Sequence, residues 1–236
     1  MEWLKAGLYQ YGDDLRLLFI MMAIAAATLV GCATPPIEHS RSAEPEVRPC
    51  CRSITAVPSR RAVARTAANL VGAKTIAING QTIGYDCAGV TRAIFLRHGI
   101  DLYEGSPTDP SANGVRLIYE HVRRYGRLHR EPTVQPGDLV FFDNTWDFNG
   151  DGKLNDPLTH VGVVEQIESD GTVVFISRVA DAIARYRMNL AFPKIHKNEE
   201  GRVLNDFIRR KLPSDPARMT RLTGQLFSSF GTRLAR

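Results

Sequence analysis

The chain has 236 residues, a formal net charge of +5 and a calculated pI of about 9.2. Four cysteines in a chain of this length exclude a small disulfide-stapled scaffold. The basic residues are scattered and carry no interleaved aromatic residues, so we expect no nucleic-acid partner. The length leaves room for one folded domain besides terminal segments, and we expect that domain to be monomeric.

The amino-terminal segment predicts the compartment. Residues 17–31 form an uncharged apolar run of about 15 residues between Arg16 and Cys32. This is shorter than the roughly 20 residues of a membrane span and fits the hydrophobic region of a secretory signal peptide. Leu29-Val30-Gly31-Cys32 resembles a bacterial lipobox, which implies removal of residues 1–31 and lipidation of Cys32. The alternatives are an uncleaved anchor helix and an ordinary signal peptide.

By the same resemblance, the absence of an acidic residue directly after Cys32 implies the outer membrane, with the protein facing the periplasm. Residues 32–60 are rich in Pro, Ser, Arg and Glu and show no hydrophobic period, which predicts a flexible tether. Cys50 and Cys51 lie within this tether, and we assign them no function. The folded domain is then expected to be residues 61–236.

A cysteine lies at the predicted start of a helix in that domain. Apolar residues from Val90 onward have helical spacing, Asp86 suits the N-cap and Gly99 suits the end of the helix. Cys87 then occupies the first turn, where free amides and the helix dipole favour a thiolate. The alternative is a buried structural cysteine, which is the commoner role for a single cysteine.

A histidine lies at the start of a predicted strand. Residues 160–167 alternate so that His160, Gly162 and Val164 share one face. Residues 168–171 form a turn, and residues 172–177 form the returning strand, which places Ser177 on the His160 face and diagonal to it. Ser177 could therefore orient the imidazole, with Asp181 as another candidate. His160 is either a general base or a merely hydrogen-bonded residue.

The remaining pattern predicts an α+β fold with segregated helices and sheet. The expected helices cover residues 62–71, 111–125, 203–211 and 222–230, in addition to the helix that begins near Cys87. The expected antiparallel strands cover residues 138–142, 160–167, 172–177 and 185–188.

An acidic, glycine-rich segment precedes His160. Its spacing resembles a calcium-binding loop of the EF-hand or dockerin type, with oxygen ligands at positions 1, 3 and 5 and glycine at position 6. The expected Ca²⁺ residues are Asp147, Asn149, Asp151, Lys153 and Asp156. Position 12 is Leu158 in place of an acidic residue, and Asp156 or Asp143 could substitute. The expected role of the metal is structural, and the alternative is an ordinary acidic surface loop.

Three blocks, Tyr85-Asp86-Cys87-Ala88-Gly89, residues 136–142 and His160-Val161-Gly162-Val163, resemble the NlpC-type cell-wall cysteine peptidases, which are papain-like and related to the CHAP amidases. The resemblance spans roughly residues 62 to 180. It implies hydrolysis of amide bonds in peptidoglycan stem peptides, with Cys87 as nucleophile, His160 as general base, and Tyr85 and Asp86 at the substrate. No catalytic cofactor is implied.

The third polar residue departs from the family pattern. The family commonly has a histidine on the strand after the catalytic histidine, and this chain has Ser177. A serine hydroxyl can accept a hydrogen bond from the imidazole but carries no charge to stabilise an imidazolium. A non-catalytic envelope lipoprotein that keeps the fold for binding, and a thiol acyltransferase or thioesterase, therefore remain as alternatives.

Overall fold

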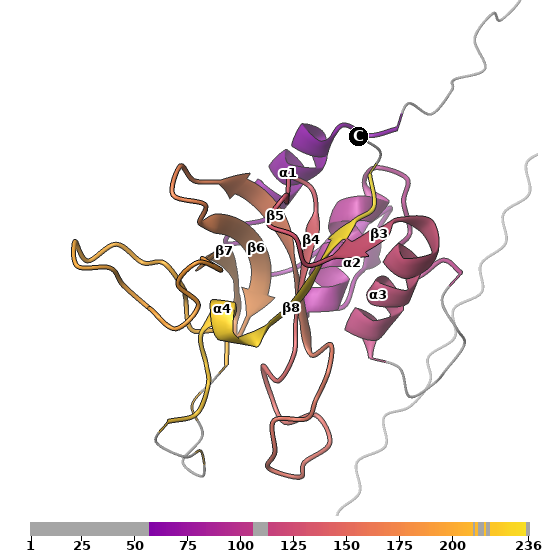
Figure 1. Cartoon of the computed structure of the whole chain (residues 1–236). Coiled ribbons are helices and arrows are strands. Elements are labelled where there is room, and N and C mark those ends of the chain that lie inside the picture. The colour runs from indigo at the N-terminus through magenta and orange to yellow at the C-terminus, as the bar shows by residue number, and fades with distance from the viewer. Residues whose placement is uncertain (1–56, 106–112, 210, 212–214, 216–217, 235–236) are drawn as a thin grey trace, which may run out of the picture. The chain divides into compact units, whose positions relative to one another are not determined.

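The computed structural model describes residues 57–105, 113–209, 211, 215 and 218–234, which belong to one unit of the chain, Ser53–Arg236. A six-stranded antiparallel sheet runs through this unit in the order β3-β8-β4-β5-β6-β7 (Figure 1). Its strands are β3 (Arg127–His129), β4 (Leu139–Phe142), β5 (His160–Ile167), β6 (Val173–Val179), β7 (Ala182–Met188) and β8 (Phe227–Thr232).

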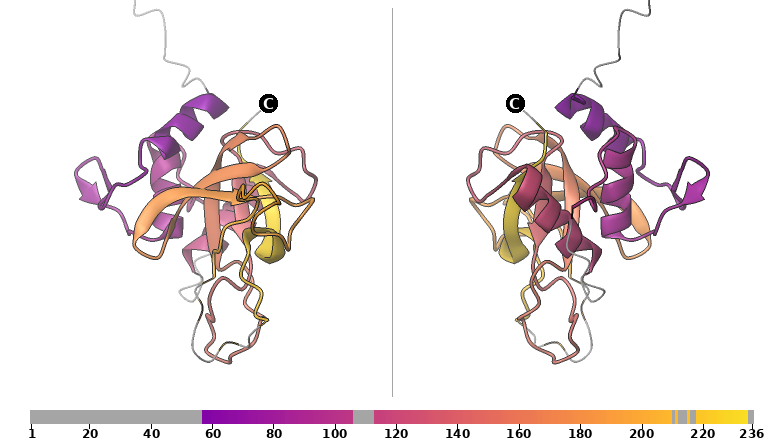
Figure 2. Two further views of the ribbon diagram at one scale, coloured as in Figure 1. Left: turned by 90° about the vertical axis from the view of Figure 1, so that its left-hand side faces the viewer. Right: turned by 90° about the vertical axis from the view of Figure 1, so that its right-hand side faces the viewer.

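Three helices cover one face of the sheet (Figure 2). They are α1 (Arg60–Ala68), α2 (Cys87–Leu96) and α3 (Gly114–Tyr125), and a two-stranded hairpin of β1 (Ala77–Ile78) and β2 (Gln81–Thr82) lies between α1 and α2 in the chain. Alternation along the strands builds this core. Leu139 and Phe141 of β4 and Val161 and Val163 of β5 face the helices, and all are fully buried.

The opposite face of the sheet holds a second core. Val140, Phe142, Val164 and Phe175 lie on it. The segment that follows β7 and the short helix α4 (Thr223–Leu226) cover this face and contribute apolar side chains such as Ile208. Both faces of the sheet are therefore buried, which explains why β4 reads as a continuous apolar run.

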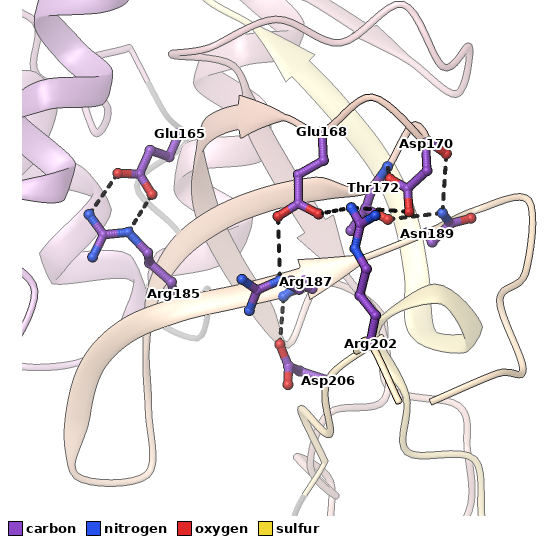
Figure 3. A network of polar contacts seen from close by, with 9 residues as sticks. All are labelled: Glu165, Glu168, Asp170, Thr172, Arg185, Arg187, Asn189, Arg202 and Asp206. Atoms are coloured by element: carbon purple, nitrogen blue, oxygen red, sulfur yellow. Dashed lines mark hydrogen bonds and ion pairs between the residues drawn. The ribbon is translucent and has the colours of Figure 1, made fainter. Parts of the chain in front are cut away.

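Polar contacts fasten this covering segment to the outer strands (Figure 3). Arg202 forms ion pairs with Glu168 and Asp170 in the β5–β6 turn. Asp206 accepts a 2.7 Å hydrogen bond from the backbone N–H of Arg187 on β7. The segment is thus tied to the β5–β6 turn and to β7.

Several predicted elements are confirmed. β5 has the predicted bounds, β6 is Val173–Val179 where residues 172–177 were predicted, and β7 begins earlier than predicted, at Ala182. The helix α2 begins at Cys87 with Asp86 as its N-cap. The mixed helices and antiparallel sheet agree with the predicted α+β class. The first helix begins at Arg60, which the sequence placed in the tether, and Arg60 forms a 2.6 Å ion pair with the buried Asp138 beside β4.

The predicted helical carboxyl-terminal extension is wrong. Residues 203–209 form bends and isolated bridges, and the predicted helix at 222–230 is α4 followed by β8. The apolar positions Leu222, Leu226 and Phe230 have helical spacing, but β8 inserts between β3 and β4 and gains backbone partners on both edges. Tertiary pairing overrides local spacing here.

No helix among the described residues is long and apolar enough to cross a membrane. The predicted signal peptide, the lipidation site Cys32, and Cys50 and Cys51 lie outside the described residues.

Candidate active site

Cys87 is the first residue of α2, and its position depends on tight local packing. The Asp86 carboxylate accepts a 2.7 Å hydrogen bond from the Gly89 N–H, which caps the helix. A Cβ on Gly89 would lie 2.0 Å from the carbonyl oxygen of Gly84, so only glycine lets the preceding chain cross the helix start. Cys87 itself is partly accessible and forms no disulfide.

His160 begins β5, where Phe142 of β4 is its partner. The chain reaches it through Leu158, a non-glycine residue at φ +54°. The Asp143 carboxylate accepts from the Leu158 N–H at 2.8 Å, and the Asn113 side chain donates to the Leu158 carbonyl at 3.3 Å. These contacts hold an unfavourable backbone conformation two residues before the histidine.

Ser177 lies against the imidazole. Its Oγ is 2.8 Å from His160 Nε2 and donates a 2.7 Å hydrogen bond to the Val161 carbonyl oxygen. The single hydroxyl proton is used in that second bond, so Ser177 accepts from the Nε2–H of His160. The His160 tautomer is therefore protonated at Nε2, and Nδ1 is left as a free base. The predicted contact is present, whereas Asp181, the alternative, lies exposed in the β6–β7 turn.

The contact between Ser177 and His160 depends on the register of β5 and β6, which includes an irregularity that the sequence did not predict. β5 and β6 pair Ile167 with Val173, which leaves a five-residue connection in place of the predicted four. A shift between Val164 and Gln166 then restores the pairing of Val163 with Ile176. Ser177 consequently faces Gly162 as predicted.

Gly162 lies in a tightly packed part of β5. A Cβ there would lie 2.6 Å from the Phe175 ring and 3.2 Å from the Ser177 Cβ. The space beside His160 on β5 is therefore filled by protein and is not an approach for a ligand.

The resting thiol is protonated. Burial, and secondarily the charge of Asp86, raise the pKa of Cys87 to about 11, although backbone N–H groups of Val161, Ala88 and Cys87 act in the opposite direction. The amides at the helix start lower the pKa of the thiol, as predicted, but the net pKa is raised. Desolvation outweighs the amides at the first turn of α2.

The imidazole is neutral as well. Burial, and secondarily the positive charge of Arg178, lower the pKa of His160 to about 3. At neutral pH the site therefore holds an uncharged thiol and an uncharged imidazole. In such a pair the separated ion pair is costly because the site is desolvated, so transfer of the thiol proton to the imidazole would have to accompany attack by the thiol.

Cys87 and His160 open into one cleft of about 730 Å³. α2 and α3 contribute Cys87, Ala88, Gly114 and Val115 to its walls, and the carboxyl-terminal segment contributes Phe207 and Ile208 on another side. Trp146 lies at this cleft with 51% of its surface exposed. The cleft is of the size that small-molecule and peptide ligands occupy.

The two residues expected at the substrate are placed differently. Asp86 lines the cleft, although one of its oxygens is used in capping α2. Tyr85 packs against the helical core, and its hydroxyl donates to the Ala73 carbonyl. The guanidinium of Arg178, a residue of the cleft wall, stacks over the Tyr85 ring, so Tyr85 contacts Arg178 and not the cleft itself.

The expected calcium residues form a loop closed by its own backbone. The Asp147 carboxylate accepts from the N–H groups of Gly150, Asp151 and Gly152 at 2.8 to 3.1 Å. Asn149 and Asp151 likewise accept from backbone N–H groups at positions 151 and 153. No group of three or more His, Cys, Asp or Glu among the described residues is arranged to hold a metal ion.

Asp156, the residue expected to complete that set, is buried. Its Oδ1 accepts a 3.2 Å hydrogen bond from Asn149 N–H, and its Oδ2 has no hydrogen-bond partner among the described residues. Lys153 is exposed. The loop therefore keeps its alternative interpretation as an acidic surface connection, and calcium remains a prediction.

Sequence reasoning missed three residues of this site. Arg178 lines the cleft beside His160, Asn113 holds the backbone before His160, and Trp146 lies at the cleft. Arg178 follows Ser177 on β6, so strand alternation could have placed it on the face toward α2. Asn113 is the N-cap of α3, so its position at a helix start was readable locally, but its contact with Leu158 was not. Nothing local in the sequence marks Trp146.

Comparisons with known proteins found one distant structural similarity. No protein-family model matches the chain, and no curated protein matches it. Among solved structures, the chain is similar to the P60 domain of an antigen from M. avium subspecies paratuberculosis, with 16% sequence identity, 55% of this chain and 85% of that chain covered, and a TM-score of 0.33.

Proposed function

We propose that the protein is a cysteine hydrolase that cleaves amide bonds of peptidoglycan stem peptides. The observation that carries the proposal is the meeting, in one cleft, of a helix-start cysteine with a histidine whose tautomer is fixed by Ser177. The choice of peptidoglycan rests on the sequence resemblance of three motif blocks. The choice of hydrolysis rests on the chemistry of the thiol and imidazole.

In the proposed reaction, Nδ1 of His160 takes the thiol proton as Sγ of Cys87 attacks the scissile carbonyl carbon. The tetrahedral intermediate collapses when the imidazolium returns the proton to the leaving amine, which forms an acyl-enzyme. Water then attacks the thioester with His160 as base, and the carboxylic acid and the free thiol are released. Ser177 accepts the Nε2–H throughout, so the ring keeps its orientation.

The free backbone N–H groups at the start of α2 suit the developing oxyanion. The Cys87 and Ala88 amides act on the sulfur in the resting site, where they lower the pKa of the thiol. In the tetrahedral intermediate the oxyanion lies one bond from the carbon attached to that sulfur, within reach of the same helix terminus.

We further propose that the enzyme is anchored by lipid on Cys32 and faces the periplasm from the outer membrane. The support is the apolar run that ends in Leu29-Val30-Gly31-Cys32. A tether of the predicted composition would let the domain reach substrate a few nanometres from the anchor.

The test is digestion of purified sacculi followed by mass analysis of the released fragments. We expect the wild-type chain to release peptides with new amine and carboxyl ends, and Cys87→Ala and His160→Ala to release none while keeping a cooperative melting transition. Wild-type activity in Cys87→Ala would refute the mechanism. A folded wild-type protein that binds sacculi without cleaving them would favour the envelope-binding alternative.

A further inference from the structure

The cleft that holds Cys87 and His160 carries an excess of positive charge. Its basic lining residues are Arg178, Arg209, Lys211 and Arg221. Asp86 is the single acidic residue among the described residues that line it, and one oxygen of its carboxylate is already bonded to the Gly89 N–H. A cleft with this balance favours an anionic ligand.

Two of the four cations have clear structural roles. Arg209 is buried, donates a 2.7 Å hydrogen bond to the Asn144 carbonyl and lies 3.7 Å from the Asp215 carboxylate. The guanidinium of Arg221 lies 5.0 Å from the centroid of the Phe207 ring. These arginines hold the covering segment in place, and Lys211 is exposed.

Arg178 differs from them. It lies on β6, and its guanidinium carbon is 5.1 Å from the centroid of the Tyr85 ring. Among the described residues, none accepts a hydrogen bond from its guanidinium or forms an ion pair with it, whereas Arg209 is bonded to Asn144 and paired with Asp215. The Nε of Arg178, like that of Arg209, is buried without an acceptor among these residues. Because the Nε is shielded from solvent, a ligand in the cleft would meet the terminal N–H groups of this guanidinium, for which a carboxylate is the matching acceptor.

The Arg178 side chain is held in place before any ligand binds. Tyr85, which supports the guanidinium, is itself fixed by its hydrogen bond to the Ala73 carbonyl and by packing against the helical core. A planar guanidinium held on an aromatic ring keeps its in-plane N–H groups available for a carboxylate. Little conformational entropy remains to be lost when a ligand binds.

We propose that Arg178 is a substrate-binding residue that holds a free carboxylate of the peptide close to the amide bond to be cleaved. The site would thus select acidic peptides over their uncharged analogues. This inference rests on the proposed hydrolase function, since it names a feature of the substrate for that same cleft.

A bound carboxylate would also assist the chemistry. The charge of Arg178 opposes protonation of His160, as the lowered pKa of the imidazole indicates. A carboxylate paired with Arg178 cancels much of that charge, which makes the imidazolium formed during thiol attack less unfavourable. An acidic substrate would therefore have a higher kcat as well as a lower KM than its uncharged analogue.

The test compares two forms of one substrate pool. Soluble muropeptides released from sacculi by a glycan-cleaving enzyme are used either as isolated or after carbodiimide-driven amidation of their free carboxyl groups with ammonium. We expect the wild-type chain to cleave the native pool about ten-fold faster in kcat/KM, the discrimination typical of one charge-assisted hydrogen bond. We expect Arg178→Gln to reduce this ratio to near one, and Arg178→Lys to give an intermediate ratio.

Arg185→Gln is the matched control. It removes the same charge from the neighbouring strand β7, where Arg185 pairs with Glu165 outside the cleft (Figure 3). This variant should keep the wild-type ratio. Equal cleavage of the two pools by the wild-type chain, or an unchanged preference in Arg178→Gln, would overturn the proposal.

Two further measurements cover the remaining outcomes. If Arg178→Gln does not fold, the wild-type preference must weaken with added salt, because a charge-based preference is screened, and a salt-independent preference would overturn the proposal. If the wild-type chain cleaves neither pool, the hydrolase function fails, and equilibrium binding of the two pools decides. The carboxylate site would be supported if the wild-type chain binds the native pool more tightly than the amidated pool and if Arg178→Lys and Arg185→Gln keep this preference. Equal binding of the two pools would overturn it.

Discussion

The hydroxyl of Ser177 lies 2.8 Å from Nε2 of His160 and is committed as a donor to the Val161 carbonyl. The imidazole must therefore donate to Ser177, and Nδ1 remains free to accept the thiol proton. A neutral serine thus fixes the tautomer, although it cannot stabilise an imidazolium as a charged partner would.

Ser177→Ala should lower kcat on the order of 2- to 10-fold with little change in KM, because His160 loses one neutral hydrogen bond and with it a fixed orientation. The control is Ser229→Ala, which removes a buried hydroxyl that has no partner among the described residues. Equal kinetics for Ser177→Ala and wild type would show that the contact does not orient the base. The ring tautomer can be followed independently from the ¹⁵N shifts of His160.

The reactivity of Cys87 should follow its raised pKa. In a Cys32→Ser, Cys50→Ser, Cys51→Ser background, iodoacetamide should modify Cys87 slowly at pH 7, and the rate should still rise at pH 10, since the pKa is about 11. In denaturant the profile should level off near the ordinary value of about 8.5. A native profile that levels off below pH 8 would contradict the protonated resting thiol.

Asp86→Asn separates the two causes of that raised pKa. Asparagine is also a good N-cap, so the helix start should be kept while the charge that raises the pKa is removed. We expect the alkylation profile to move to lower pH, by less than the full difference from an ordinary thiol because burial is the larger cause.

Acid should destabilise the fold partly through His160. The imidazole is buried and neutral, with a folded-state pKa of about 3 against an ordinary 6.5. Its contribution to stability is fully present above pH 6.5 and is lost as the pH falls toward 3, because the unfolded chain then binds the proton more readily. His160→Gln should flatten the fall in the free energy of unfolding over this interval, measured by denaturant titration. Parallel pH profiles for both proteins would contradict the lowered pKa.

Calcium should raise the melting temperature if residues 147–156 bind it only in the folded state. Asp151→Ala should abolish this response, and Asp181→Ala, which removes an exposed carboxylate elsewhere, should keep it. A melting temperature that is insensitive to chelator and to millimolar calcium would identify the segment as an ordinary acidic loop.

Lipidation at Cys32 should make the protein fractionate with membranes and incorporate a labelled fatty acid. Cys32→Ser should lose both properties, while Cys50→Ser and Cys51→Ser keep them. An unlabelled wild-type protein would refute the anchor.

The sequence by itself determined the elements whose signals are local. The cap at Asp86 and the apolar spacing after it placed Cys87 at a helix start, and period-two alternation gave β5 its bounds. Parity along the strands even placed Ser177 on the His160 face. These features depend on residues near one another in the chain, so a single sequence carries them.

Only the tertiary structure decided the rest. β8 is an interior strand because β3 and β4 supply hydrogen-bond partners on both of its edges, although its own spacing favours a helix. The thiol is protonated because desolvation, which depends on what surrounds Cys87, outweighs the local effect of the helix start. Arg178 lies at the cleft with its guanidinium over the ring of Tyr85, which is distant in the chain. Burial and long-range pairing arise between distant segments, and the local pattern of residues does not record them.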